Sequence, residues 1–169
     1  MSIRRADFPR ISRPAGETQP LQRPSQIPVA QPGLIGLALA DGLTRDLIRL
    51  RFERLGWQVV TAGSGPDALH LLETRTLALI LLDLWLPQVN GLEVLRQAQN
   101  PAPAIILSDV ASPELVLGAV AAGALGFVLK PIDLDALVLR ARQTMTGSPA
   151  GPFVDKPRLA AQMPGTTPT

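Results

Sequence analysis

Leu79-Ile80-Leu81-Leu82-Asp83 is followed without interruption by Leu84-Trp85-Leu86-Pro87. A short, unbroken aliphatic run is typical of a strand that helices cover on both faces. Pro87 cannot continue that strand, and Asn90-Gly91 predicts a turn before the next helix. Asp83 therefore stands at the carboxyl end of a central strand, the position at which open α/β sheets place their chemistry.

The composition favours one domain without a membrane span. The chain has 169 residues, of which 46% are hydrophobic, and this is enough for a packed core. It has no cysteine, which excludes disulfides and thiolate metal sites, and its single histidine, His70, argues against a histidine-rich metal site. No apolar run is as long as a membrane span, and residues 1–13 lack the apolar core of a signal peptide. We therefore expect a cytoplasmic protein.

Proline divides the chain into three parts. Residues 1–32 contain six of the 17 prolines, are mildly basic and have few apolar side chains. Such a segment cannot bury enough surface to offset its ordering entropy, so we expect a disordered Pro/Arg-rich arm. Residues 147–169 hold five more prolines and are expected to form a second disordered tail. The folded domain is then expected over residues 33–146.

Aliphatic runs alternate with helical patterns through this central part. Strands are expected over residues 33–40, 57–62, 79–83, 104–108 and 126–129. Helices are expected over 45–55 with Thr44 as N-cap, from Pro66, over 91–99, from Pro113 with Ser112 as N-cap, and from Asp133 to about Thr146. Five strands that alternate with five helices imply right-handed crossovers and a doubly wound parallel sheet with helices on both faces.

Three separated stretches in this order resemble the receiver domain of two-component response regulators. Asp83 to Pro87, with Gly91 following, is similar to the family's phospho-acceptor strand and loop. Ile105 to Ser108 ends in the expected hydroxyl, and Gly123 to Pro131 carries an aromatic, a lysine and a proline. The resemblance covers residues 33–146 and implies the flavodoxin-like strand order 2-1-3-4-5.

The resemblance implies a role for each of these side chains. Asp83 would accept a phosphoryl group as a nucleophile, and Lys130 would bring a mobile positive charge to the phosphoryl oxygens. Ser108 would bond the phosphoryl group, and Phe127 would follow the serine, changing the outer face of the fourth helix and fifth strand. A cis peptide bond before Pro131 could fix the direction of the lysine.

The resemblance also implies a Mg²⁺ site, which this sequence supports weakly. The family places two adjacent acids at the end of its first strand, but Leu39 and Ala40 align there without gaps, and Asp41 falls one place later. Because Mg²⁺ requires oxygen ligands, we expect a weak site made of Asp83, Asp41 and the backbone carbonyl of Trp85. Asp41 could equally be an acid that only starts a helix.

A further departure is Asp109, which follows Ser108 directly and would repel a phosphoryl group. We therefore describe the chain as an atypical, stand-alone receiver with a degenerate acidic metal site.

The chain would be a signalling protein and not an enzyme. Its phosphoryl donor would be a histidine kinase or a phosphotransfer protein, and it would signal through a downstream protein or as a self-dimer. Direct DNA binding is not expected, because residues 147–169 are too few and too proline-rich for a helix-turn-helix domain.

Two other functions stay open. The first is a pseudo-receiver, in which the face made by the fourth helix and fifth strand binds proteins without phosphorylation. The second is a small flavodoxin-like binder of a nucleotide or a flavin. The second needs a loop that holds phosphate, and Gly63-Ser64-Gly65-Pro66 is short, with a proline that removes one backbone donor.

Overall fold

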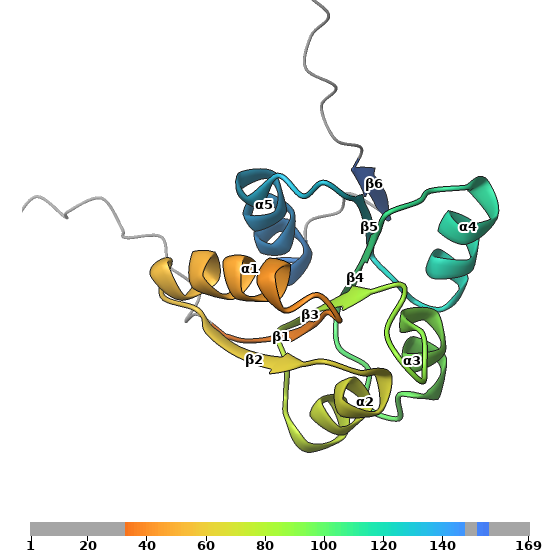
Figure 1. The fold of residues 1–169 in the computed structure, drawn as a ribbon, viewed down its shortest axis with the longest axis horizontal. Helices are drawn as coiled ribbons and strands as arrows, with labels where there is room; N and C mark the ends of the chain where they lie inside the picture. The colour runs from red at the N-terminus through yellow and green to blue at the C-terminus, as the bar shows by residue number, and fades with distance from the viewer. Residues whose placement is uncertain (1–32, 148–151, 156–169) are drawn as a thin grey trace, which may run out of the picture.

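The computed structural model describes residues 33–147 and 152–155, which form one parallel sheet and the helices that cover it (Figure 1). The strands are β1 (Leu34–Ala38), β2 (Gln58–Ala62), β3 (Leu79–Asp83), β4 (Ala104–Ser108), β5 (Gly126–Leu129) and β6 (Phe153–Asp155). The helices are α1 (Gly42–Arg54), α2 (Gly65–Thr74), α3 (Gly91–Gln97), α4 (Pro113–Ala121) and α5 (Leu134–Met145). No helix in these residues is both long and apolar enough to cross a membrane.

The strand order across the sheet is β2-β1-β3-β4-β5-β6, with every neighbouring pair parallel. Helices α1 and α5 pack on one face of the sheet, and α2, α3 and α4 pack on the other (Figure 1). The predicted doubly wound α/β fold and the order 2-1-3-4-5 are confirmed, and one strand is added at the β5 edge.

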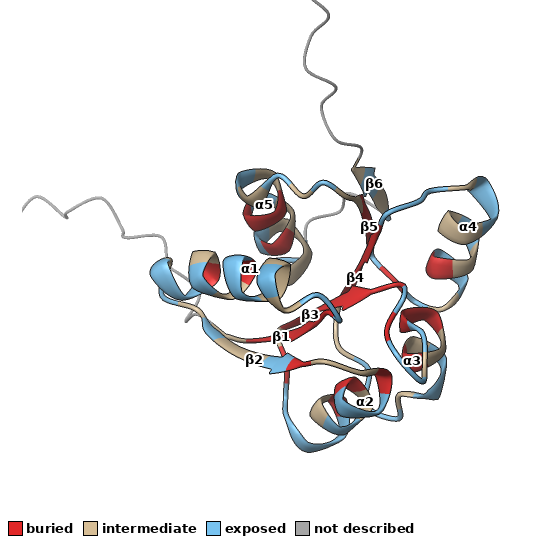
Figure 2. Cartoon of the chain, viewed as in Figure 1, coloured by how far each residue is buried: buried red, intermediate tan, exposed pale blue. Residues whose placement is uncertain are grey.

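The central strand contributes to two separate cores. Leu79 and Leu81 pack with the residues under α1 and α5, whereas Ile80 and Leu82 pack with those under α2, α3 and α4. Successive side chains of a strand point to opposite faces, so a strand covered on both sides has no polar position until it ends. Strand β3 is accordingly buried along its whole length, as Figure 2 shows. Its aliphatic sequence follows directly from this position.

The first helix begins three residues earlier than the sequence predicts. Its N-cap is Asp41 and not Thr44, and the Asp41 carboxylate accepts hydrogen bonds from both the backbone N–H and the hydroxyl of Thr44. Aspartate caps a helix better than threonine does, which explains why the earlier residue takes this place. The predicted cap Ser112 of α4 is confirmed, and Asp133, which was expected to start α5, is the N-cap of that helix.

Strand β6 was not predicted. Phe153–Asp155 was assigned to the disordered tail, but it pairs in parallel with Gly126–Val128 of β5. An aromatic and a β-branched residue favour a strand once an edge is available to pair with, and no pattern in the sequence indicates that β5 offers one. The predicted arm 1–32 and residues 148–151 and 156–169 of the predicted tail lie outside the described residues, so the division into three parts stays a prediction.

Candidate functional site

Three strand ends meet at one edge of the sheet. Asp83 closes β3, Ser108 closes β4, and Lys130 follows β5 directly. In the register of the sheet, Asp83 lies opposite Leu107, and Ser108 lies opposite Leu129. Because all of these strands run in parallel, their carboxyl ends share an edge, and the functional side chains can reach one another there.

Asp83 and Lys130 are in direct contact. Lys130 Nζ lies 3.1 Å from Oδ2 of Asp83, and Asp83 is only 4% exposed. A buried carboxylate is costly unless it is paired, and the lysine provides that pairing across β4. The position of the lysine backbone is also fixed, because the backbone N–H of Lys130 donates to the Ser108 carbonyl at 2.8 Å. The peptide bond between Lys130 and Pro131 is cis, as the sequence predicts.

Lys130 has a second partner, Asp109. The distance from Lys130 Nζ to Asp109 Oδ2 is 3.6 Å, and the Asp109 side chain is well exposed to solvent. This contact was missed by the sequence analysis, which considered Asp109 only as a source of repulsion. An acid that follows β4 directly, beside the lysine that follows β5, was the available signal. The two aspartates thus share one ammonium group.

Ser108 is fully buried, and its hydroxyl bonds within its own loop. Its Oγ donates to the Val110 carbonyl at 2.7 Å and accepts from the Val110 N–H at 3.2 Å. The serine therefore lies at the predicted edge of the sheet, but its hydrogen bonds go to Val110 and not to Asp83 or Lys130. A phosphoryl group on Asp83 would have to draw the hydroxyl out of these two bonds.

The loop after β3 is shaped around the carboxylate. The Trp85 N–H points to Asp83 Oδ1 at 3.4 Å, while the indole ring is largely exposed. The loop returns to the strand end at Gly91, where a Cβ would lie only 2.4 Å from the Asp83 carbonyl oxygen. Only glycine at position 91 allows α3 to approach β3 this closely. The N-cap of α3 is Asn90, whose side chain accepts from the Glu93 N–H at 2.9 Å.

The end of β1 lies beside β3, and no carboxylate stands at residues 39 and 40. Leu39, at the first acid position, is fully buried in the core under α1 and α5, and Ala40 beside it has no side-chain oxygen. The Leu39 carbonyl accepts from Arg45 Nη1 at 2.7 Å, which places a guanidinium at this strand end. Among residues 33–147 and 152–155, no three His, Cys, Asp or Glu side chains are grouped so that they could hold a metal ion.

Asp41 lies at the edge of this site with its carboxylate already engaged. Hydrogen bonds from the Thr44 hydroxyl and backbone N–H hold the pKa of the Asp41 carboxyl below its ordinary value, and the charge of Lys130 contributes a smaller lowering. The geometry of Asp41 is that of a helix N-cap.

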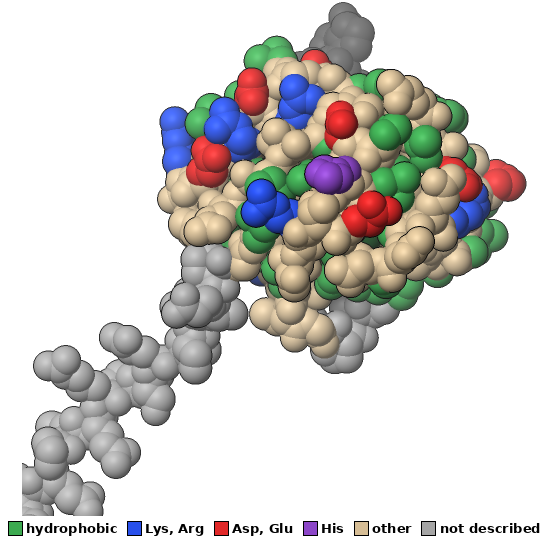
Figure 3. Space-filling model, turned by 90° about the horizontal axis from the view of Figure 1, so that it is seen from below, with side chains coloured by type: hydrophobic (Ala, Val, Ile, Leu, Met, Phe, Trp, Pro, Cys, Tyr) green, Lys and Arg blue, Asp and Glu red, His purple; other side chains and the backbone are tan. Residues whose placement is uncertain are grey.

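Two other features that the sequence singled out, His70 and the loop 63–66, lie outside the site around Asp83. His70 is exposed on α2, on a surface where charges of both signs are interspersed (Figure 3). In the loop 63–66, the Gly65 N–H donates to the Pro87 carbonyl at 3.1 Å. A Cβ on Gly65 would meet the Val89 carbonyl oxygen at 2.1 Å. This loop therefore packs against the loop after β3, which argues against a phosphate-binding role.

Comparisons with known proteins agree on one family. Residues 40–142 match the response regulator receiver domain. A probable transcriptional regulatory protein of Picosynechococcus sp. is 35% identical over 60% of this chain and 45% of its own length. The probable transcriptional regulatory protein TcrX of Mycobacterium tuberculosis is 33% identical over 55% of this chain and 40% of its own length. This chain therefore spans less than half the length of either relative.

Solved structures share the fold. The receiver domain of the Francisella response regulator 1452 is 26% identical, with a TM-score of 0.64, and the match covers 68% of this chain and 98% of that one. A receiver domain protein from Methanospirillum hungatei is 24% identical, with a TM-score of 0.65, over 68% of this chain and 94% of that one.

Proposed function

The chain belongs to the response regulator receiver family, whose members are non-enzymatic signalling modules, and we propose that it accepts a phosphoryl group on Asp83. The observation that supports this proposal is the contact of 3.1 Å between Lys130 Nζ and Asp83 Oδ2. A buried carboxylate at the carboxyl end of the central strand, with a mobile cation beside it, has the two groups that acceptance of a phosphoryl group needs from the protein.

The donor would be the phosphohistidine of a histidine kinase or phosphotransfer protein in the cytoplasm. An Asp83 oxygen forms a bond to phosphorus while the bond from phosphorus to the donor nitrogen breaks, and the electron pair of that bond stays on the histidine. Lys130 then exchanges its contact with the carboxylate for one with a phosphoryl oxygen. The added negative charge offsets the loss of the original ion pair.

The readout of this event would pass through Ser108 and Phe127. Ser108 must break its two bonds to Val110 to reach a phosphoryl oxygen. Phe127 is almost fully buried beside α4, so its ring can move only if the surface around α4 and β5 rearranges. Such a change would be read by a downstream protein or by a second copy of the chain.

The proposal includes an impaired Mg²⁺ site. Receiver domains typically bind Mg²⁺, but Leu39 and Ala40 supply no side-chain oxygen here, and Arg45 brings a positive charge to the same strand end. Asp83, Asp41 and the Trp85 carbonyl are the remaining candidate ligands, and Asp41 is engaged with Thr44. When bound, the ion would neutralise charge on the transferred group. We expect its binding to be weak.

A second candidate function is a pseudo-receiver that signals without phosphorylation. The observation that favours it is the sharing of Lys130 between Asp83 and Asp109 at 3.1 and 3.6 Å, which already satisfies the lysine. In this case, the face of α4 and β5 would bind a partner protein directly.

We also propose that the chain is divided into an arm at 1–32, a receiver unit at 33–146 and a tail at 147–169.

The experiment that separates these functions is phosphorylation by acetyl phosphate over a series of Mg²⁺ concentrations, followed by intact mass. A mass increase of one phosphoryl group that is absent in Asp83→Ala supports the receiver. Half-maximal labelling is expected only at Mg²⁺ concentrations well above those that a receiver with both strand-one acids requires. If wild type gains no mass at any Mg²⁺ concentration, the pseudo-receiver is favoured.

A further inference from the structure

A three-residue strand, β6, covers the edge of the sheet. Phe153–Asp155 pairs in parallel with Gly126–Val128, and the Phe153 N–H donates to the Leu125 carbonyl at 3.3 Å. Figure 1 shows β6 on the outside of β5, at the side of the sheet where α4 and α5 flank it. A ladder of three residues supplies few hydrogen bonds, so its side-chain contacts decide whether it stays in place.

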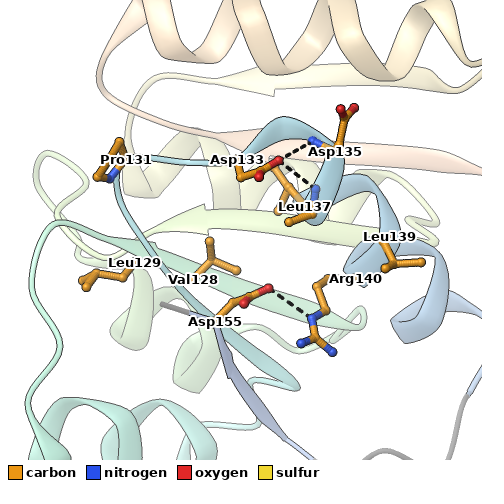
Figure 4. A pocket seen from close by; sticks show the side chains of 10 residues that line it. Val128, Leu129, Pro131, Asp133, Asp135, Leu137, Leu139, Arg140 and Asp155 are labelled. Atoms are coloured by element: carbon orange, nitrogen blue, oxygen red, sulfur yellow. Dashed lines mark hydrogen bonds and ion pairs between the residues drawn. The ribbon is translucent and has the colours of Figure 1, made fainter. Parts of the chain in front are cut away.

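Two residues of the domain hold β6 through specific contacts. The Phe153 ring lies on Gly126, where a Cβ would meet the ring carbon Cζ at 2.4 Å. Arg140 of α5 lies over the same ring, with its Cζ 4.7 Å from the ring centroid. Arg140 Nε also donates to Asp155 Oδ2 at 3.1 Å, as Figure 4 shows. The β5 edge therefore selects an aromatic residue and an acid two positions later.

On the α4 side, β6 meets the predicted switch residue. Phe127 and Val154 are register partners, and both line a small cavity of about 50 Å³ between α4, β5 and β6. On the α5 side, β6 helps to enclose a larger cavity of about 490 Å³, which Asp155 lines together with residues of β5 and α5 (Figure 4). Strand β6, which only three residues pair with β5, is therefore part of the packing around Phe127.

Exposed apolar side chains lie beside β6. Val120 of α4 lines the small cavity that Val154 lines, and Leu139 of α5 lines the larger cavity that Asp155 lines. Leu125, whose carbonyl accepts from the Phe153 N–H, and Val154 itself are also exposed. Apolar side chains that gather beside a sheet edge are typical of a surface that other protein chains contact.

We propose that β6 is an intramolecular cover of the β5 edge and that its release lets a second copy of this chain pair with β5. Without β6, the outer edge of β5 would present unpaired N–H and C=O groups beside the exposed apolar side chains, which is a template for another strand. The segment Phe153–Asp155 of a second copy has the aromatic and the acid that Gly126 and Arg140 select. The contacts that hold β6 within one copy can therefore also hold β6 of a second copy.

The inference rests on the proposed function in one respect, namely that movement of Phe127 is the event that releases β6. Phe127 and Val154 are neighbours in the sheet, so a shift of the ring changes the contacts that keep β6 in place. The cover and its contacts to Gly126 and Arg140 do not depend on phosphorylation and can be tested without it.

The test uses variants of the full chain that weaken the cover from the domain side. Gly126→Ala places a methyl group where the Phe153 ring lies, and Arg140→Gln removes the ion pair with Asp155. The matched controls are Gly118→Ala, whose methyl would make an ordinary contact of 3.6 Å, and Arg142→Gln, an exposed arginine on the same helix. Phe153→Ala removes the ring without altering the domain, so its result does not depend on tolerance of a change in β5.

Hydrogen exchange of residues 153–155 and sedimentation velocity over a concentration series are the two readouts. Each of the three test variants alone should exchange roughly tenfold faster in this segment, with β1 and β3 unchanged, and should self-associate no more than wild type, because the same contacts would hold β6 of a second copy. A mixture of Phe153→Ala, which keeps an intact β5 edge, with Gly126→Ala, which keeps an intact β6, should form a heterodimer that neither variant forms alone. Both controls should behave as wild type. Fast exchange of residues 153–155 in wild type, or a mixture that stays monomeric although each variant alone releases β6, would overturn the proposal.

The same samples, treated with acetyl phosphate, separate this inference from the proposed function. If the mixture of Phe153→Ala with Gly126→Ala forms the heterodimer while Asp83 gains no mass, the cover stands and phosphorylation fails. If Asp83 is labelled but the exchange of residues 153–155 does not change, the link from Phe127 to β6 is wrong.

Discussion

Lys130 Nζ lies 3.1 Å from Oδ2 of Asp83, and this ion pair joins the ends of β3 and β5 across β4. Replacing the lysine by methionine leaves a buried carboxylate without its partner. We expect Lys130→Met to lower the free energy of unfolding by about 1–3 kcal/mol, less than for a fully buried pair, because the lysine is partly exposed. Urea unfolding measures this loss.

The control for this prediction is the same substitution in an Asp83→Asn background. The amide carries no charge, so loss of the lysine should cost less than half as much there. Equal costs in both backgrounds would mean that Lys130 stabilises the fold through contacts other than the ion pair.

Asp109 competes with a phosphoryl group for the same ammonium group, at 3.6 Å. Asp109→Asn should therefore increase the rate of labelling by acetyl phosphate, by about twofold to fivefold, because an exposed pair contributes up to roughly 1 kcal/mol. Asp46→Asn, at an exposed position on α1, is the matched control and should label as wild type does. A decrease in the rate for Asp109→Asn would show that this carboxylate assists the reaction.

An acid returned to the end of β1 should restore metal binding. Ala40 is exposed, so Ala40→Asp adds a carboxylate without disturbing the core, whereas Leu39 is fully buried. We expect this variant to reach half-maximal labelling at a Mg²⁺ concentration roughly tenfold lower than wild type, since Mg²⁺ prefers carboxylate oxygens. Ala40→Asn adds a similar volume without the charge and should give a smaller shift. No shift for either variant would indicate that the metal site is not the limiting defect.

Gly91 is required where α3 begins against β3. A Cβ at this position would lie 2.4 Å from the Asp83 carbonyl oxygen, so the backbone has to move. Gly91→Ala should destabilise the chain by about 1–3 kcal/mol in urea unfolding. Gly118→Ala, where a Cβ would make an ordinary contact, should be neutral or stabilising. Similar losses for both variants would contradict the role given to this close approach.

The cap of α1 should depend on pH. Hydrogen bonds from Thr44 lower the pKa of the Asp41 carboxyl, so this interaction adds stability above the ordinary pKa of 3.8 and loses it as the pH falls toward the lower pKa of the folded chain. Thr44→Val should therefore lower the Tm at neutral pH and have progressively less effect below pH 3.8. Thr74→Val, which removes an uncharged bond in α2, should have an effect that does not vary in this way. A constant effect of Thr44→Val would mean that the cap does not involve the charge.

The local sequence was sufficient to predict those elements whose bounds are marked by neighbouring residues. The bounds of β3, β4 and β5 were predicted to the residue, because each is an aliphatic run that stops at a polar residue or a proline. The convergence of Asp83 and Lys130 was also predictable, since parallel strands that end in functional residues share an edge. Their role in phosphoryl transfer stays a prediction.

Contacts between residues far apart in the chain could not be predicted in the same way. The contact of Lys130 with Asp109 joins the residues that follow β5 and β4, and it depends on how the two strand ends lie in the sheet. The strand β6 is the largest such case. Three residues in a proline-rich segment have no periodicity to detect, and their structure comes from Gly126 and Arg140, which precede them in the sequence.

The sequence by itself determined the doubly wound fold, because alternating aliphatic strands and amphipathic helices can bury their apolar faces in only a few ways. Only the tertiary structure decided which charges share Lys130, and that the β5 edge is closed by the chain's own Phe153–Asp155. Those outcomes depend on distances between separate strand ends and loops, and a linear pattern of residue types does not contain such distances.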